Sequence, residues 1–230
     1  MITTQNLQDL LRSIGYNKLS NSSRDVWQKN FSLSNSQIVV DFDHQKINYP
    51  KELKIHRETT TNFSSNENFV VLECITRLLS LGYKPHHLEL EKGMPGGHSD
   101  TGGYCDIIIQ DNDGNEFLLI ECKTEGKEFQ DAWHRMLQDG GQLFNYFNSY
   151  RKAKALCLYT SDYEMEDDGT GHCSYTSYFV SMIDNVDYLK TDDKLRGYGD
   201  VARELGGKGE YFAVWRDTYD CDYRTVGIFE

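Results

Sequence analysis

The sequence contains no long apolar run, no paired-cysteine motif and no excess of basic residues. A membrane-spanning helix needs about 18 consecutive apolar residues, and a secretion signal needs a basic segment followed by an apolar one. Neither pattern is present, so we expect a soluble, cytoplasmic protein with no membrane partner. Gly207-Lys208 is followed by Gly209, so the chain also lacks the G-x-x-x-x-G-K-[ST] motif of one class of ATP-driven motors.

The cysteines are scattered rather than grouped. The six cysteines are at positions 74, 105, 122, 157, 173 and 221. None of them forms a C-x-x-C pair, and three lie within apolar runs. Disulfide-rich proteins and zinc sites usually show recognisable cysteine spacings. We therefore expect reduced cysteines, several of them in the core of the protein.

The charge balance limits the partners that the chain can bind alone. It has 36 acidic and 24 basic residues, which give a formal net charge of -12. Phosphate binding draws its free energy from Lys and Arg side chains that displace counterions. Either nucleic acid is not the substrate, or other domains hold it. If double-stranded DNA is a partner, this chain alone should bind it weakly and without sequence preference.

The length of 230 residues fits one domain of ordinary size with extensions. Residues 1–62 form a lead-in with a short amphipathic helix, and we expect it to pack on the core. Residues 64–67 fit a capping box, which predicts a helix that ends near Gly82. The core should span residues 63–185, and residues 186–230 form a C-terminal extension with a predicted helix at 193–205 and a strand at 211–215.

Two apolar runs around residues 104–109 and 117–123 form the most informative pattern. Asp111–Asn115 between them contains residues that tolerate turns, so the two runs predict a β-hairpin. Side chains alternate along a strand, so Glu121 and Lys123 share one face. Asp106 lies near the start of the other strand. Two carboxylates that converge with an ammonium suit a site that holds one or two Mg²⁺ ions and acts on a phosphate.

The remaining elements complete an α/β arrangement. A strand at 88–91 and a loop with five glycines at 93–103 precede the hairpin, and a helical stretch at 129–150 follows it, with a break at Gly140-Gly141. An apolar strand at 153–159 comes next. The order is helix, three strands, helix, strand (αβββαβ), which predicts an α/β fold with a mixed central sheet flanked by helices.

These residues resemble the PD-(D/E)xK nuclease superfamily. The likeness rests on the helix that carries Glu73, the strand that opens at Asp106, Glu121-Cys122-Lys123, and the helix with the Q-x-x-x-Y motif at 142–146. Within the superfamily, the chain is most similar to the N-terminal nuclease domain of type I restriction subunits and of related single-chain restriction-modification enzymes. The resemblance covers about residues 64–162, and neither residues 1–50 nor the last forty residues have a counterpart in it.

The resemblance implies a restriction-endonuclease-like fold and a role for each motif residue. Asp106, Glu121 and the backbone carbonyl of Cys122 would bind Mg²⁺, for which Mn²⁺ would substitute. Glu73 would add a ligand, often through water. Lys123 would orient the attacking water or help to deprotonate it.

The helix that follows would support the same site. Gln142 and Tyr146 are four residues apart, so they project from one helix face, and the resemblance implies that they support the site or touch DNA. Each residue also has an ordinary interpretation. Glu73 lies away from the apolar stripe of its helix and fits a solvated acid, while Gln142 and Tyr146 fit simple helix packing.

Two classes of function remain open. The chain is either a metal-dependent DNA endonuclease domain of a restriction-modification system, or a catalytically inert module of the same fold that binds nucleic acid or partner subunits. In the first case, translocase, methylase or specificity domains on a longer polypeptide or on partner subunits would deliver the DNA. An inert module has no physical need for three costly polar groups at one place, so Asp106, Glu121 and Lys123 favour the endonuclease.

Overall fold

The computed structural model describes residues 1–20, 23–94, 103–166 and 169–181. The C-terminal extension at 186–230, with its predicted helix and strand, lies outside these residues. Most of the glycine-rich loop at 93–103 lies outside them too. Within the described part, no helix is both long and apolar enough to pass through a membrane.

The centre of the fold is a six-stranded mixed sheet with the order β10-β9-β8-β7-β6-β5. The β5–β6 and β8–β9 pairs are parallel, and the other neighbours are antiparallel. The strands span, in chain order, Lys54–Ile55 (β5), Leu88–Gly93 (β6), Tyr104–Gln110 (β7), Glu116–Cys122 (β8), Ala155–Met165 (β9) and Gly171–Ser181 (β10). The predicted α/β class with a mixed sheet is therefore confirmed.

The hairpin of β7 and β8 forms where the sequence predicts it. Gly114 in the turn has a φ of 77°, which favours glycine. The backbone N–H of Asp111 donates to the carbonyl of Asn115 at 2.9 Å and closes the loop. Beyond the turn, Ile107 pairs with Ile120 and Ile109 with Leu118.

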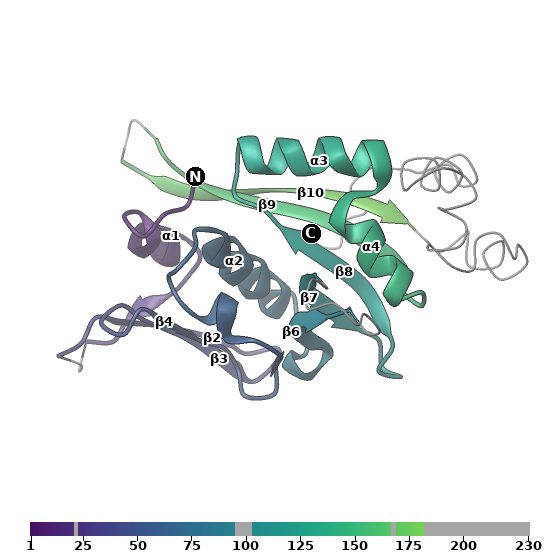
Figure 1. Ribbon diagram of the computed structural model, residues 1–230. Helices are drawn as coiled ribbons and strands as arrows, with labels where there is room; N and C mark the ends of the chain where they lie inside the picture. Colours follow the sequence, from purple (N-terminus) through teal and green to yellow (C-terminus); the bar gives the residue numbers. More distant parts are fainter. Residues whose placement is uncertain (21–22, 95–102, 167–168, 182–230) are drawn as a thin grey trace, which may run out of the picture.

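Helices cover both faces of this sheet (Figure 1). Helix α2 (Glu67–Ser80) packs on one face, and α3 (Lys127–Asp139) and α4 (Gly141–Ser149) pack on the other. Gly140 and Gly141 have φ values of 79° and 56°, so the chain turns sharply between α3 and α4. The predicted break of this helical stretch is confirmed.

The N-terminal residues build a second layer. Helix α1 (Leu7–Ser13) precedes a four-stranded antiparallel sheet, and Figure 1 shows α2 between this sheet and the larger one. The small sheet contains β1 (Asn17–Lys18), β2 (Val26–Phe31), β3 (Ser36–Asp41) and β4 (Lys46–Asn48), and two short 3₁₀ helices follow along the chain, η1 (Glu58–Thr61) and η2 (Pro85–His87). One apolar core joins the small sheet, α2 and one face of the large sheet. The lead-in therefore packs on the core, and its β5 also extends the large sheet.

The core contains four of the described cysteines, in line with the expectation that several would be buried. Cys74, Cys105, Cys122 and Cys157 are buried and unpaired, and Cys173 is half-buried and also unpaired. Cys221 lies outside the described residues. Four buried thiols behave here as small apolar side chains that fill the core.

Candidate metal-dependent phosphodiesterase site

The strands separate at the point where the sequence places its acidic motif. The β7–β8 ladder runs as far as the pair Ile107 and Ile120, and the next residues are Asp106 and Glu121. The Asp106 carboxylate replaces the missing backbone pairing, because its Oδ2 accepts a hydrogen bond from the Cys122 N–H at 2.7 Å. The end of β8 stays attached to β9 instead. The interrupted ladder creates room for a polar pocket between the strand ends.

Glu121 and Lys123 form an ion pair in this opening. Lys123 Nζ lies 2.7 Å from Glu121 Oε1, as their positions two residues apart on one strand face predict. The backbone N–H of Lys123 donates to the carbonyl of Tyr159 on β9 at 2.9 Å, which fixes the strand end. The Glu121 carboxylate is only 3% exposed, and its Oε2 accepts no hydrogen bond within the described part of the chain. One buried carboxylate oxygen therefore lacks a hydrogen bond of good geometry, although the neighbouring Tyr146 side chain acts to lower the pKa of Glu121.

The electrostatics of the site favour an additional positive charge. Burial raises the pKa of Glu121 to about 7, although Lys123 beside it acts to lower that pKa. Burial and the charge of Glu121 raise the pKa of Asp106 well above its ordinary value. Burial alone would lower the pKa of Lys123, but the neighbouring carboxylates outweigh it and raise that pKa. One ammonium does not compensate the buried acids.

Helix α4 brings the Q-x-x-x-Y residues to the same place. Gln142 Nε2 donates to the Tyr146 hydroxyl at 3.3 Å, and this hydroxyl donates to the carbonyl of Tyr104 at 2.6 Å. Gly103 permits the approach, because a Cβ there would lie 3.1 Å from the Tyr146 ring. Burial and the charge of Glu121 raise the pKa of Tyr146. Tyr146 thus fixes the start of β7 two residues before Asp106.

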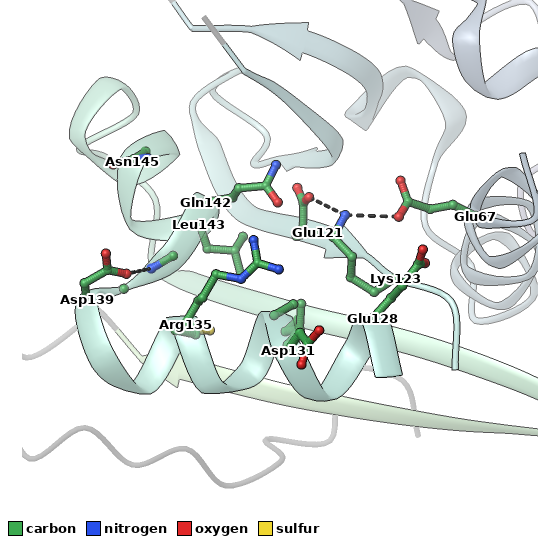
Figure 2. A pocket seen from close by; sticks show the side chains of 15 residues that line it. Glu67, Glu121, Lys123, Glu128, Asp131, Arg135, Asp139, Gln142, Leu143 and Asn145 are labelled. Atoms are coloured by element: carbon green, nitrogen blue, oxygen red, sulfur yellow. Dashed lines mark hydrogen bonds and ion pairs between the residues drawn. The ribbon is translucent and has the colours of Figure 1, made fainter. Parts of the chain in front are cut away.

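Two hollows meet at these side chains. One has a volume of about 410 Å³ and is lined by Asp106, Glu121, Lys123, Gln142 and Tyr146, together with residues of η1, α2 and β6. The other, of about 440 Å³, extends from the same residues along α3 and α4 (Figure 2). Both hollows are lined by the same four residues, Glu67, Glu121, Lys123 and Gln142. The acidic motif therefore lies where the two hollows meet.

Sequence reasoning missed Glu67 as a member of the site. Its Oε2 lies 3.1 Å from Lys123 Nζ, so the ammonium lies between Glu67 and Glu121 (Figure 2). The predicted capping box is wrong, because the N-cap Asn66 makes no side-chain capping bond and Glu67 turns toward Lys123. An acid in the first turn of α2 was the available signal, but its partner is 56 residues away along the chain.

Glu73 lies away from the pocket. Its carboxylate accepts hydrogen bonds from the Tyr159 hydroxyl and from Arg77, both at 2.6 Å, on the α2 side of the sheet. It lines neither hollow at the motif. The alternative of a solvated helix acid is wrong as well, since Glu73 is buried. Both interpretations assumed a helix with one exposed face, whereas α2 packs between two sheets.

The residues at the motif fit a Mg²⁺ ion in part. The described residues contain no group of three or more Asp, Glu, His or Cys side chains arranged to hold a metal. However, Mg²⁺ keeps several of its waters and is often bound by only one or two carboxylates. Asp106 and the unpartnered oxygen of Glu121 meet that smaller requirement. The Cys122 carbonyl remains a candidate third ligand by its position between Glu121 and Lys123.

No protein-family model matches the chain, and no curated protein matches it. The functional argument therefore rests on the residues themselves: two buried acids, a lysine between two carboxylates, and an adjoining pair of hollows.

Proposed function

We propose that this chain is a Mg²⁺-dependent DNA endonuclease domain of the PD-(D/E)xK type that works in a restriction-modification system. The observation that carries the proposal is the convergence of Asp106, Glu121 and Lys123 where β7 and β8 separate, with one buried Glu121 oxygen unpartnered. Buried carboxylates with this little compensation are unfavourable unless a function requires them.

Each side chain has a distinct role in the proposed reaction. Bound Mg²⁺ supplies Lewis acidity toward a phosphoryl oxygen and lowers the pKa of a bound water. Asp106 and Glu121 hold the cation through their carboxylate oxygens. Lys123, which is protonated because its pKa is raised, stabilises negative charge on the phosphate and orients the attacking water. Gln142 and Tyr146 keep the strand end and helix in register around the phosphate.

The fold supports the same proposal. The αβββαβ order of α2, β6, β7, β8, the α3–α4 pair and β9 is the order that the superfamily resemblance implies. The acids lie on the two antiparallel strands of the hairpin, and β9 runs parallel to β8. A fold of this kind can serve several functions, so the site rather than the topology carries the conclusion.

The acidic character of the protein shapes how DNA reaches the site. With a net charge of -12, the mean field of the chain repels the phosphate backbone. The second hollow adds Glu128, Asp131 and Asp139 to its rim, with Arg135 as the basic residue of α3 there. Translocase, methylase or specificity domains would therefore hold the DNA, while this chain contacts the scissile phosphate locally.

The test combines cation binding with DNA nicking by the same chain. Wild-type protein should bind Mn²⁺ in calorimetry and, at high protein concentration, slowly nick supercoiled DNA only when Mg²⁺ or Mn²⁺ is present. Asp106→Asn and Glu121→Gln should each reduce the nicking rate by at least about 100-fold, because each replaces an anionic carboxylate ligand by a neutral amide. Their far-ultraviolet circular dichroism should match that of wild type.

Asp113→Asn is the matched control, since it removes one acid from the exposed hairpin turn. It should nick at the wild-type rate. Nicking by Asp106→Asn at that rate would overturn the assignment. Cation binding without any metal-dependent nicking, at every protein concentration, would replace the endonuclease by the inert binding module.

A further inference from the structure

Glu91 on β6 has a backbone conformation that its side chain disfavours. Its φ is 55°, in the left-handed region that glycine adopts readily and glutamate does not. Strain of this kind persists only when the surrounding structure enforces it, and it concentrates at functional sites. The strand continues normally on both sides, so the distortion is confined to this residue.

The register of the sheet places Glu91 opposite the acidic motif. In the β6–β7 ladder, Leu90 pairs with Ile107 and Lys92 with Cys105, so Glu91 stands across from Asp106. The β7–β8 register likewise brings Asp106 level with Glu121. The β6–β7 ladder is interrupted at this row, and the β7–β8 ladder ends just before it. Three neighbouring strands therefore each contribute a carboxylate at one level of the sheet.

The Glu91 side chain turns inward rather than toward solvent. Its residue is 8% exposed and lines the hollow of about 410 Å³ that contains Asp106, Glu121 and Lys123. Like charges at directly opposed strand positions destabilise a sheet. A solvated strand acid would be exposed and unstrained, and Glu91 is neither. The Thr59 side chain hydrogen-bonds to this carboxylate, and burial nevertheless raises its pKa. Backbone strain and burial together are consistent with a ligand in the hollow.

An independent observation points to the same ligand. Glu121 Oε2 is buried at the motif and accepts no hydrogen bond from any described residue. Glu121 also lines the hollow that Glu91 lines. A cation with its bound waters would satisfy this oxygen and reduce the repulsion within the row. The cation of this lining, Lys123, already contacts both Glu67 and Glu121, and Glu91 lines the same hollow.

We propose that Glu91 is a third acidic residue of the site, a positioning residue whose carboxylate accepts hydrogen bonds from water molecules on the cation held by Asp106 and Glu121. This inference rests on the proposed function. Among the described residues, no three acidic, histidine or cysteine side chains meet around one metal position. A contact of Glu91 through water agrees with this observation. It also suits Mg²⁺, which gives up its waters reluctantly.

The conformation of the backbone explains why the residue is held in this way. A regular strand would pair Glu91 with Asp106 through backbone hydrogen bonds and continue the ladder. The left-handed turn at Glu91 interrupts that pairing instead, and the hollow opens at the interruption. The same distortion therefore opens the pocket and places a carboxylate at its wall.

Calorimetric titration with Mn²⁺ on the complete chain is the first test. Glu91→Gln should weaken the affinity by about tenfold, in the lower range for residues that orient metal-bound groups. Glu91→Asp should stay within about threefold of wild type, because it keeps the carboxylate and aspartate tolerates a positive φ better. Glu58→Gln, an exposed acid on η1, should leave the affinity unchanged.

Melting in the presence of a chelator tests the strain without any metal. Glu91→Gly and Glu91→Ala both remove the carboxylate, but only glycine suits a φ of 55°. Glu91→Gly should therefore melt at a higher temperature than Glu91→Ala, while both bind Mn²⁺ about tenfold more weakly than wild type. Equal melting temperatures of the two variants would contradict the strained conformation.

The outcomes separate this inference from the proposed function. If Glu91→Gln binds Mn²⁺ as tightly as wild type while Asp106→Asn loses binding, the role of Glu91 is overturned and the metal site stands. If wild-type protein binds no Mn²⁺, the metal site itself is overturned. A tenfold loss in Glu91→Gln, with Glu58→Gln unchanged, supports the assignment.

Discussion

Two buried glutamates in the large sheet have opposite electrostatic surroundings. Glu89 on β6 and Glu121 on β8 are 2% and 3% exposed. Glu89 contacts Lys54 at 3.2 Å, His56 at 2.8 Å and Lys92 at 3.1 Å. Burial raises its pKa, but these partners outweigh burial and the pKa is lowered. Burial dominates at Glu121, where the pKa is raised to about 7.

The difference shows that burial alone does not mark a functional acid. Glu89 also accepts a hydrogen bond from Gln110 at 2.6 Å, so its carboxylate is saturated by the protein itself. Glu121 shares its one ammonium with Glu67 and keeps one oxygen unpartnered. The partners of Glu89 stabilise its charge within the fold, whereas the unpartnered oxygen of Glu121 is consistent with the proposed cation.

The largest expected effect concerns Lys123. Lys123→Ala should reduce metal-dependent nicking by at least about 100-fold, because the ammonium acts on phosphate charge or on the attacking water. Cation affinity should not fall, since a competing positive charge is removed. Lys123→Arg should fail to restore the rate, as a planar guanidinium does not replace a compact ammonium. Calorimetry beside a nicking assay separates the two effects, and lost affinity with retained nicking would refute this division of roles.

A smaller effect is expected at the saturated acid. Glu89→Gln should lower the free energy of unfolding by about 1–3 kcal/mol, because Lys92 and His56 lose a buried partner. Urea unfolding at neutral pH measures this change, and Mn²⁺ affinity should be unaffected. If Glu89→Gln instead weakened Mn²⁺ binding, the contrast between the two glutamates would be lost.

The two glutamates should also respond to pH in opposite ways. The lowered pKa of Glu89 gives stability that is present above the ordinary glutamate pKa and lost as pH falls through the lowered value. The raised pKa of Glu121 has the reverse sign. The charged Glu121 carboxylate destabilises the folded protein. This destabilisation is absent below the ordinary pKa of 4.5 and complete above a pH of about 7.

Unfolding of the two variants across pH, with a chelator present, checks these windows. The destabilisation in Glu89→Gln should fade as the solution becomes acidic. The stabilisation in Glu121→Gln should appear as pH rises from 4.5 to about 7. A stabilisation of Glu121→Gln that is independent of pH would arise from packing rather than from charge.

The sequence predicts those parts of the site that local rules determine. Turn residues at 111–115 and the alternation of strand side chains suffice to bring Glu121 and Lys123 together beside Asp106. The glycines at 140 and 141 predict the sharp turn that directs α4, with Gln142 and Tyr146, toward the strand ends. These features depend on neighbours within a few residues or within one hairpin.

The parts that the sequence does not predict depend on tertiary surroundings. Glu73 seemed separate from the apolar stripe of its helix, but α2 is covered on both sides and Glu73 binds Arg77 and Tyr159 within the core. Glu67 seemed to be a capping residue, and its partner Lys123 is distant along the chain. The positive φ of Glu91 has no signature in the residue type, because glutamate rarely adopts it.

The central proposal is that the buried acids Asp106 and Glu121, of which Glu121 keeps an unpartnered oxygen, bind a divalent cation. Thermal melting of wild type and Glu121→Gln, in chelator and in millimolar Mn²⁺, tests it most directly. In chelator, Glu121→Gln should be the more stable protein, because it removes a buried charge. The expected gain in the free energy of unfolding is about 1–3 kcal/mol. In Mn²⁺ the order should reverse, because only wild type gains full binding energy from the cation. If Glu121→Gln remains the more stable protein at every Mn²⁺ concentration, the two acids do not form a cation site.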